Sequence, residues 1–487
     1  MPTADLTILA RESPWWADPG AVDRDPHLTT VDDSPLRWSP PIPFDPTRPA
    51  IYTLRGPRQV GKTTLLKLWI RSLLRDSAQD PQSILYLDCE RAGLIDQRDL
   101  LETVRGYLEW VAGREPVTVC LDEVTRIPGW GAAIRGLADE GALRSVVVVA
   151  TGSHALDLKR GGERMPGRRG QGEDLDRLLL PLSFRDYVAV KSPGTVERLA
   201  GISLSEPLDE VRRSAEGTVV HDVVLAAEFQ RYLATGGFLN AAAREVSEAR
   251  IGTALYLQHR DAFIGEVIRT GHRESYFREL VRWLFPRLGA EFSWRDLAAE
   301  TEIGAHATAR AYVEDLEELF LWHVFHRVKT PERPRPAFKS PKKLYPGDPF
   351  TYHTLFAWGR GLPDPWLSTR EVLGDPALTG RLVESIVADH LRRLFGRNCF
   401  YYRSPGGEEI DFVCWRGAGS PTVIEVKWRG RLGARDWQAL SARGGGLLLT
   451  RDRLSVLSHR PPVLAVPAHV ALALLEAPTL KAVGFAD

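Results

Sequence analysis

The residues with the clearest chemistry form a glycine-rich loop near the start of the chain. An apolar run at 51–54 precedes the loop as a predicted strand, and a predicted helix at 65–70 follows it. The loop fits the phosphate-binding pattern G-x-x-x-x-G-K-[ST] with Gly56, Pro57, Arg58, Gln59, Val60, Gly61, Lys62, Thr63 and Thr64. Backbone N–H groups of such a loop converge on phosphate oxygens. We expect Lys62 to reach the β- and γ-phosphates of a nucleoside triphosphate and Thr63 to hold Mg²⁺.

Two acidic residues supply the second half of this site. Asp122 and Glu123 follow an apolar strand at 117–121. Charge on a transferring phosphoryl group must be neutralised, so Asp122 is predicted to bind Mg²⁺ and Glu123 to polarise the attacking water. The next strand is followed by Ser153, which we expect either to sense the γ-phosphate or to belong to a simple turn.

A second set of chemistry-bearing residues lies near the C-terminus. Glu384 lies in a predicted helix, Asp411 in one strand, and Glu425 and Lys427 in another. This set is similar to the PD-(D/E)xK nuclease pattern. Residues i and i+2 of a strand share a face, so Glu425 and Lys427 point the same way. The three acids are predicted to hold Mg²⁺, which would activate a water, while Lys427 steadies negative charge. The alternative is a surface ion pair worth less than ~1 kcal/mol.

Basic residues near this set indicate DNA as a partner. Five side chains on the neighbouring segments are candidates for contact with the DNA backbone: Tyr402, Arg403, Arg429, Arg431 and Arg435. The chain holds 10 Lys and 53 Arg, however, and such a bias warns against over-interpreting arginine clusters.

The elements that position the first site alternate between strand and helix. Strands are predicted at 50–55, 83–88, 116–121 and 145–150, with helices at 62–76, 97–111 and 130–140. This alternation is typical of βαβ units and a parallel sheet. The fold class is therefore α/β, beginning with a P-loop NTPase core.

After about 185 the pattern becomes helical, with helices at 222–235 and 253–270. Residues 275–330 are predicted to form a winged-helix variant. Its third helix begins at Ala305 and carries few positive charges, so it serves either DNA contact or internal packing and oligomer formation. A helix at 380–395 then precedes strands at 399–403, 409–414 and 422–427.

These patterns predict six segments. They are an irregular N-terminal arm (1–48), a P-loop ATPase core (49–190), a helical lid (191–272), a winged-helix-like segment (273–330), a linker (331–375) and a nuclease-like α/β domain (376–487).

Five segments follow one another along the chain: Gly56–Thr64, Leu121–Trp130, Ala150–Ser153, Leu180–Tyr187 and Tyr232–Phe238. Together and in this order they resemble the motifs of a family of archaeal and bacterial AAA-like ATPases. The resemblance implies ATP as the nucleotide, a winged-helix segment and a C-terminal domain of unknown function that resembles a restriction endonuclease. Leu239 replaces the proline usual in that family. The family's Lys-x-Tyr-x-x-Asp segment is matched from Lys343 to Asp348.

Net charge, cysteine content and hydropathy indicate the cellular compartment and the kinds of site that we expect. The formal net charge is zero and the four cysteines are scattered, which suits a reducing cytoplasm and argues against a zinc site. No apolar run is long enough for a membrane span. Arg168 and Arg169 are either arginine fingers, which would imply a homo-oligomer, or residues of a solvated loop.

Two functions follow from these features. The first is a Mg²⁺-dependent ATPase that couples ATP hydrolysis to DNA handling by a nuclease-like domain, in repair, recombination or defence. The alternative is a nucleotide-driven signalling switch whose C-terminal domain binds a partner or DNA without cleavage.

Overall fold

The computed structural model describes residues 6–76, 79–163, 165, 167–170, 174–417 and 419–483. The described chain forms two compact units. The first holds residues 6–180 together with 480–483, and the second holds 181–479. The chain therefore leaves the first unit after Leu180 and returns to it at Leu480.

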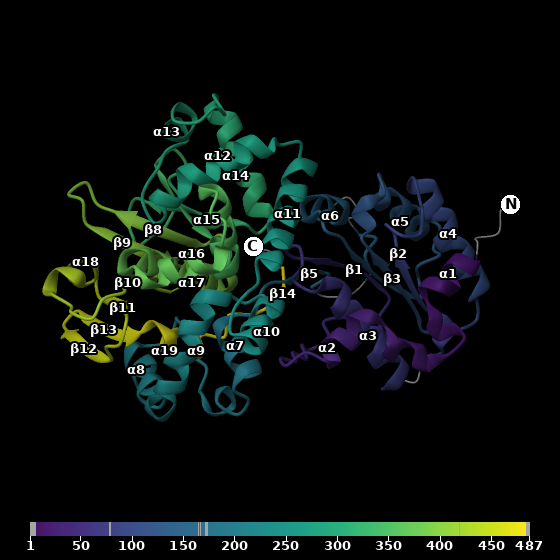
Figure 1. Cartoon of the computed structure of the whole chain (residues 1–487), viewed down its shortest axis with the longest axis horizontal. Coiled ribbons are helices and arrows are strands. Elements are labelled where there is room, and N and C mark those ends of the chain that lie inside the picture. The colour runs from purple at the N-terminus through teal and green to yellow at the C-terminus, as the bar shows by residue number, and fades with distance from the viewer. Residues whose placement is uncertain are drawn as a thin grey trace. The chain divides into compact units, whose positions relative to one another are not determined.

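The first unit is built on a six-stranded sheet whose order is β14-β5-β1-β4-β3-β2. Its strands are β1 (Ala50–Arg55), β2 (Ile84–Asp88), β3 (Val117–Asp122), β4 (Val146–Thr151), β5 (Asp176–Leu179) and β14 (Leu480–Ala482). Strands β1 to β5 are parallel to their neighbours. Only β14 runs antiparallel, against β5; both strands are labelled in Figure 1. The parallel sheet predicted from the alternation of elements is present.

Helices cover both faces of this sheet. They are α3 (Lys62–Arg75), α4 (Gln97–Trp110), α5 (Trp130–Asp139) and α6 (Ala155–Glu163), with short turns η3 (Pro81–Ser83) and η4 (Val124–Arg126). Val146 and Val148 of β4 pack with α4 and α5, whereas Val147 and Val149 pack with α3. Alternate residues of one strand thus enter two cores, which explains why β4 is continuously apolar.

The N-terminal arm is more regular than its sequence indicates. It contains α1 (Leu6–Glu12), η1 (Pro14–Trp16), η2 (Pro19–Arg24) and α2 (Pro26–Asp32); the first five residues of the predicted arm lie outside the described residues. The indole of Trp15 donates to the carbonyl oxygen of Ile84 at 2.9 Å. Three aspartates of the arm pair with a stripe of cations on α3, in the pairs Asp25–Lys67, Asp32–Arg71 and Asp23–Arg75. The arm is therefore anchored to the helix that follows the nucleotide loop.

The second unit begins with helices. They are α7 (Phe184–Lys191), η5 (Val196–Arg198), α8 (Leu208–Glu216), η6 (Val219–His221), α9 (Asp222–Thr235), α10 (Leu239–Glu248), α11 (Thr253–Arg269), α12 (Glu274–Leu284), η7 (Phe285–Arg287), α13 (Trp294–Ala299) and α14 (His306–Glu318). The helices α12, α13 and α14 match the three helices predicted for the winged-helix-like segment.

An eight-stranded mixed sheet forms the rest of the second unit, in the order β12-β13-β11-β10-β9-β8-β6-β7. Its strands are β6 (Trp322–Val328), β7 (Lys342–Pro346), β8 (Cys399–Arg403), β9 (Glu409–Cys414), β10 (Thr422–Lys427), β11 (Gly446–Thr450), β12 (Ser455–His459) and β13 (Pro462–Pro467). The accompanying helices are α15 (Pro349–Arg360), α16 (Pro365–Gly374), α17 (Pro376–Phe395), η8 (Ala434–Asp436), α18 (Gln438–Ala442) and α19 (Ala468–Leu474).

The predicted segment boundaries need correction in three places. The predicted linker at 331–375 contains β7, α15 and α16. The end of the predicted winged-helix segment holds β6, which pairs with β7 and β8 inside the eight-stranded sheet. Residues 480–483 belong to the first unit rather than to a separate C-terminal domain. Among the described helices, none is long and apolar enough to cross a membrane.

Replacing Trp15 by alanine tests the anchoring of the arm. Trp15 is completely buried, so we expect its loss to lower the unfolding free energy of the first unit by about 3–5 kcal/mol and to speed hydrogen exchange in β2. Trp110→Ala is the control, because 39% of this side chain is exposed, and it should cost less than half as much. Equal effects of the two substitutions would contradict a packed arm.

Candidate functional site

The predicted nucleotide loop connects β1 to α3 in the first unit. Gly61 precedes α3 with a φ of 103°, a left-handed conformation that favours glycine. At Gly56 a Cβ atom would lie only 2.0 Å from the carbonyl oxygen of Leu179. That oxygen belongs to the backbone of β5 and cannot rotate away as a side chain would. The loop therefore packs directly against the last residue of β5.

The ammonium group of Lys62 folds back over this loop. Its Nζ donates to the carbonyl oxygens of Gly56 at 2.9 Å and Pro57 at 3.0 Å. The N-terminus of α3 adds the partial positive charge of its N–H groups. Phosphate oxygens are the ligands that such a combination of helix terminus and ammonium attracts.

Thr63 and Asp122 lie together, although 59 residues separate them in the chain. The Thr63 hydroxyl donates to Oδ2 of Asp122 at 2.7 Å, and the Tyr86 hydroxyl donates to the same oxygen at 2.9 Å. Burial raises the pKa of Asp122, an effect that the Thr63 bond opposes and that the neighbouring charge of Glu123 reinforces. Mg²⁺ prefers hard oxygen donors, so Thr63 and Asp122 fit the predicted metal role, in which the ion would neutralise phosphate charge.

Glu123 and Ser153 lie at the same edge of the sheet as Thr63 and Asp122. Glu123 has a φ of 50°, and its Oε2 accepts a hydrogen bond from the backbone N–H of Ser153 at 3.0 Å. The guanidinium of Arg58 donates to the Ser153 hydroxyl at 3.0 Å. The residues that follow β1, β3 and β4 thus meet at the carboxyl edge of the sheet, where open α/β sheets bind ligands.

The two arginine-finger candidates are engaged within the first unit. Arg169 donates to the carbonyl oxygens of Ile51 and Leu175, both at 3.0 Å, and to Asp176 at 2.7 Å. Arg168 pairs with Asp139. These contacts give Arg169 a structural role beside β1. That either residue acts as an arginine finger in a homo-oligomer stays a prediction.

The four C-terminal candidates also come together, around a β-bulge. In the β8–β9 ladder, Asp411 and Phe412 of β9 face a single residue of β8, Tyr401. Bulges re-aim side chains and interrupt the ladder. Here the backbone N–H of Asp411 donates to Oε2 of Glu425 at 3.1 Å, and that of Val426 donates to Oδ2 of Asp411 at 3.0 Å. The two carboxylates therefore satisfy backbone donors of each other's strands.

A buried lysine that the sequence analysis did not assign to the site lies in the middle of this cluster. Lys343 of β7 is 1% exposed, and its Nζ lies 3.3 Å from Asp411 and 3.6 Å from Glu384. It also pairs with Glu409. Tyr345, two residues further on the same strand, donates to Glu384 at 2.6 Å. The matched Lys-x-Tyr spacing was the available signal, because it places both side chains on one face of a strand.

The three carboxyl groups of this cluster have different pKa shifts. Burial, and then the charge of Asp411, raises the pKa of Glu384 to about 7 and that of Glu425 to about 8. Burial alone would also raise the pKa of Asp411, but the ammonium groups of Lys343 and Lys427 outweigh it and lower that pKa. Burial thus favours the protonated forms of Glu384 and Glu425.

The donor set at this cluster does not favour the predicted magnesium ion. Both oxygens of Asp411 and both oxygens of Glu425 already accept hydrogen bonds. Lys343 supplies the positive charge that a divalent cation would bring to Asp411 and Glu384. Among the residues that the structure describes, no group of three or more His, Cys, Asp or Glu side chains is placed to hold a metal ion. The metal role of Glu384, Asp411 and Glu425 stays a prediction.

The last residue of the Lys-x-Tyr-x-x-Asp segment has a different function. Asp348 caps α15 by accepting from the N–H of Phe350 at 2.7 Å, and it accepts from the N–H of Gly237 at 2.8 Å. At Gly236 a Cβ would lie 2.2 Å from the Asp348 carboxylate. Two recurring motifs, separated by 111 residues, thus join inside the second unit.

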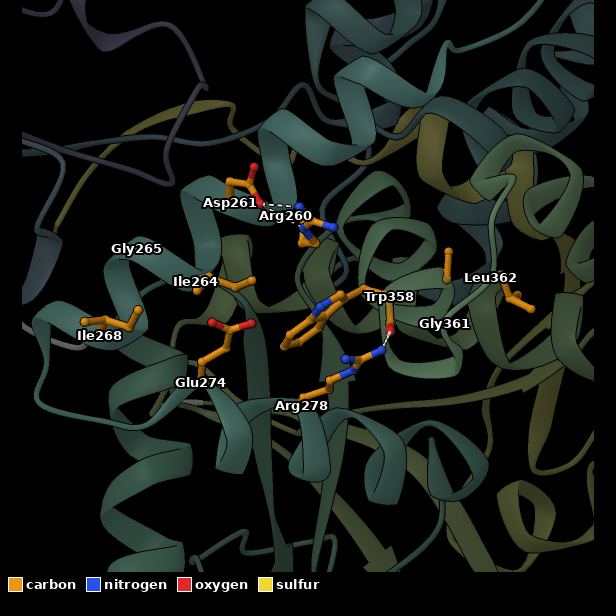
Figure 2. Close-up of a pocket in the computed structure, with 11 residues that line it drawn as sticks. Arg260, Asp261, Ile264, Gly265, Ile268, Glu274, Arg278, Trp358, Gly361 and Leu362 are labelled. Atoms are coloured by element: carbon orange, nitrogen blue, oxygen red, sulfur yellow. Dashed lines mark hydrogen bonds and ion pairs between the residues drawn. The ribbon is translucent and has the colours of Figure 1, made fainter.

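The second unit also contains a groove that no sequence motif marked. It encloses about 760 Å³ among α11, α12 and the end of α15, and Figure 2 shows Arg278 beneath Trp358. The guanidinium of Arg278 donates to the Trp358 carbonyl at 3.4 Å. The lining combines both charges with apolar side chains: Arg260, Asp261, Ile264, Gly265, Ile268, Glu274, Arg278, Ala357, Trp358, Gly361 and Leu362.

Comparisons with known families support the ATPase fold of the first unit and state no activity for the second. A model described as an AAA domain matches residues 48–188. Two domains of unknown function match the second unit, DUF8612 at 226–361 and DUF4143 at 379–446. No curated protein matches the chain. The first match supports an AAA-like ATPase domain, whereas the other two carry no stated activity and leave the restriction-endonuclease resemblance unconfirmed.

Substitution of Lys343 by methionine tests the role of the buried ammonium group. Removing one partner from buried ion pairs costs about 3–5 kcal/mol, so we expect the second unit to lose stability by that order at pH 8. Without the cation, the folded-state pKa of Asp411 should rise above its unfolded value. The lost stability should then return as the pH falls to 5, because the folded protein takes up protons.

Thermal unfolding measured from pH 5 to pH 8 checks this expectation. Lys339→Met is the control, because Lys339 is exposed on the same segment. A penalty for Lys343→Met that is independent of pH, or equal to that of the control, would contradict the assigned role.

Proposed function

We propose that the chain is a Mg²⁺-dependent ATPase whose nucleotide state controls binding of a partner by the second unit, without cleavage of that partner. The observation that carries the proposal is the contact of the nucleotide loop with β5. Gly56 packs against the carbonyl of Leu179, and Leu179 is the register partner of Leu480 in β14. These two residues lie where the chain leaves and re-enters the first unit.

The hydrolytic step is assigned to residues at the carboxyl edge of the first sheet. Lys62 binds the β- and γ-phosphates, and Thr63 with Asp122 holds the magnesium ion that neutralises phosphate charge. Glu123 orients and polarises the attacking water. Ser153, which contacts both Glu123 and Arg58, is placed to respond when the γ-phosphate is lost.

The relay from this site follows from steric contact. A phosphate bound in the loop gives Lys62 a partner other than the Gly56 and Pro57 carbonyls, so the loop can change its conformation. Gly56 cannot move toward β5 without displacing the Leu179 backbone. Because β5 and β14 are hydrogen-bonded neighbours, a shift of one strand is passed to both chain segments that lead to the second unit.

The buried lysine supports binding rather than cleavage by the second unit. A metal-dependent nuclease needs carboxylate oxygens that are free to ligate the ion. Here those of Asp411 and Glu425 accept bonds from backbone N–H groups and lysines. The cluster accordingly serves to hold β7, β9, β10 and α17 together.

DNA is the partner that charge favours. Residues 427–460 contain eight Lys and Arg against two Asp and Glu, and Arg431 and Arg435 are exposed. Such a stretch suits the phosphate backbone, whose affinity for protein falls steeply with added salt.

A second candidate function is Mg²⁺-dependent cleavage of DNA by the same unit. The observation that favours it is the convergence of Glu384, Asp411, Glu425 and Lys427, which the nuclease-like pattern predicts. Cleavage requires that DNA and magnesium together displace Lys343 from Asp411.

Glu123→Gln tests the ATPase assignment. The amide keeps the shape and a hydrogen-bond acceptor for the Ser153 N–H but cannot act as a base. We expect ATP turnover to fall at least about 100-fold, with affinity for ATP within about three-fold of wild type. Lys62→Ala is the comparison, because it should lose binding as well. Turnover that survives both substitutions would remove the assignment.

A cleavage assay separates the two candidate functions. Wild type and Asp411→Ala are incubated with linear, branched and single-stranded DNA, with and without ATP and Mg²⁺. The proposal expects DNA binding that weakens with salt and no cutting by either protein. Mg²⁺-dependent cutting by wild type that Asp411→Ala abolishes would establish the nuclease instead. Binding independent of salt would point to a protein partner.

A further inference from the structure

Two cysteines of the second unit lie directly opposite each other on neighbouring strands. Cys399 of β8 is the register partner of Cys414 of β9. Their Sγ atoms are 2.7 Å apart, and each residue is 1% exposed. This separation is shorter than two sulfur atoms keep when they merely touch, and it exceeds the roughly 2.05 Å of a disulfide bond. The two residues are therefore free thiols in position to form a bond.

The backbone around the pair has the geometry in which cross-strand side chains come closest. The N–H of Trp415 donates to the carbonyl of Asn398 at 3.1 Å. Trp415 follows Cys414 and Asn398 precedes Cys399, so this hydrogen bond joins the residues next to the pair and not the two cysteines themselves. Cys399 and Cys414 accordingly form a non-hydrogen-bonded pair, whose Cα atoms are nearer than those of the alternate type. Closing a sulfur–sulfur bond here requires a side-chain rotation rather than movement of the strands.

The other two cysteines do not share this arrangement. Cys89 and Cys120 are buried in the first unit, and the Cys89 thiol contacts the carbonyl of Leu87 at 3.8 Å. Within the described part of the chain, no sulfur–sulfur contact joins Cys89 to Cys120. They provide an internal control for any reaction of thiols.

We propose that Cys399 and Cys414 are an oxidisable dithiol that closes a cross-strand disulfide when the protein meets a hydroperoxide. One thiol attacks the peroxide oxygen and becomes a sulfenic acid, while the O–O bond breaks and the leaving oxygen takes the thiol proton and departs as water or an alcohol. The second thiol attacks the sulfenic sulfur and expels water. With hydrogen peroxide the balance is two thiols and one H₂O₂ to one disulfide and two waters, so that two electrons pass from sulfur to oxygen.

The bond would act on the strand that presents Asp411. Cys414 follows Asp411 by three residues on β9, on the far side of the bulge, and a disulfide would fix the β8–β9 register beside it. The closed loop spans the turn between the two strands, so the unfolded chain would lose freedom. Oxidation should therefore stabilise the second unit and restrict rearrangement of the acidic cluster.

Mass spectrometry of the intact protein tests the proposal. The full chain is treated with hydrogen peroxide, denatured, alkylated with iodoacetamide and digested. We expect one disulfide joining the peptides that contain Cys399 and Cys414, a mass loss of two hydrogens, reversal by dithiothreitol, and alkylation of Cys89 and Cys120. The oxidised protein should also unfold at a higher urea concentration than the reduced protein.

Control variants separate the pair from general oxidation. Cys399→Ser should leave Cys414 without a resolving partner, so that no disulfide forms, whereas Cys89→Ser should oxidise as wild type does. Recovery of all four alkylated cysteines from peroxide-treated wild type would overturn the proposal. So would sulfinic or sulfonic acid at Cys414 in place of the disulfide. Both outcomes are read from wild type alone, even if a variant fails to fold.

Discussion

The carbonyl oxygen of Leu179 occupies the space that any side chain at position 56 would need. This constraint fixes the nucleotide loop against β5, and the antiparallel β5–β14 pair places Leu480 beside Leu179. Both points at which the chain passes between the two units are thus adjacent to the loop within one sheet. A conformational change at the loop has a short steric route to both segments, and this route is the basis of the proposed nucleotide-controlled switch.

The second unit is organised around charges that are expensive to bury. Lys343 and Lys427 face the carboxyl groups of the acidic cluster. These charged side chains can be buried because each ion has partners of opposite charge. Burial also raises the pKa of Glu384 and of Glu425, which favours their neutral forms. Asp411 and Glu425 end the β9–β10 ladder by accepting from backbone N–H groups. A cluster that resembles a catalytic set can therefore serve stability, and its motif alone does not establish cleavage.

The sequence predicted local features well. Strands β1 to β4 begin and end within one residue of expectation, because each is a mainly apolar run between polar segments. The contact of Thr63 with Asp122 was also predictable, since parallel strands end at one edge. Features that depend on distant residues were missed. The segment that forms β7 was predicted to be part of a linker because it contains Lys342 and Lys343, and both lysines are buried only through contacts with residues far away in the sequence. Nothing local in residues 480–482 indicates that they complete the first sheet.

Amide hydrogen exchange measures the central claim directly. Peptides covering 176–180 and 480–483 are followed in the full chain, with and without a non-hydrolysable ATP analogue and Mg²⁺, in wild type and in Lys62→Ala. The account predicts that the nucleotide changes exchange in both peptides of wild type and in neither peptide of the variant. Protection that appears at residues 56–64 while both strand peptides exchange unchanged would contradict it.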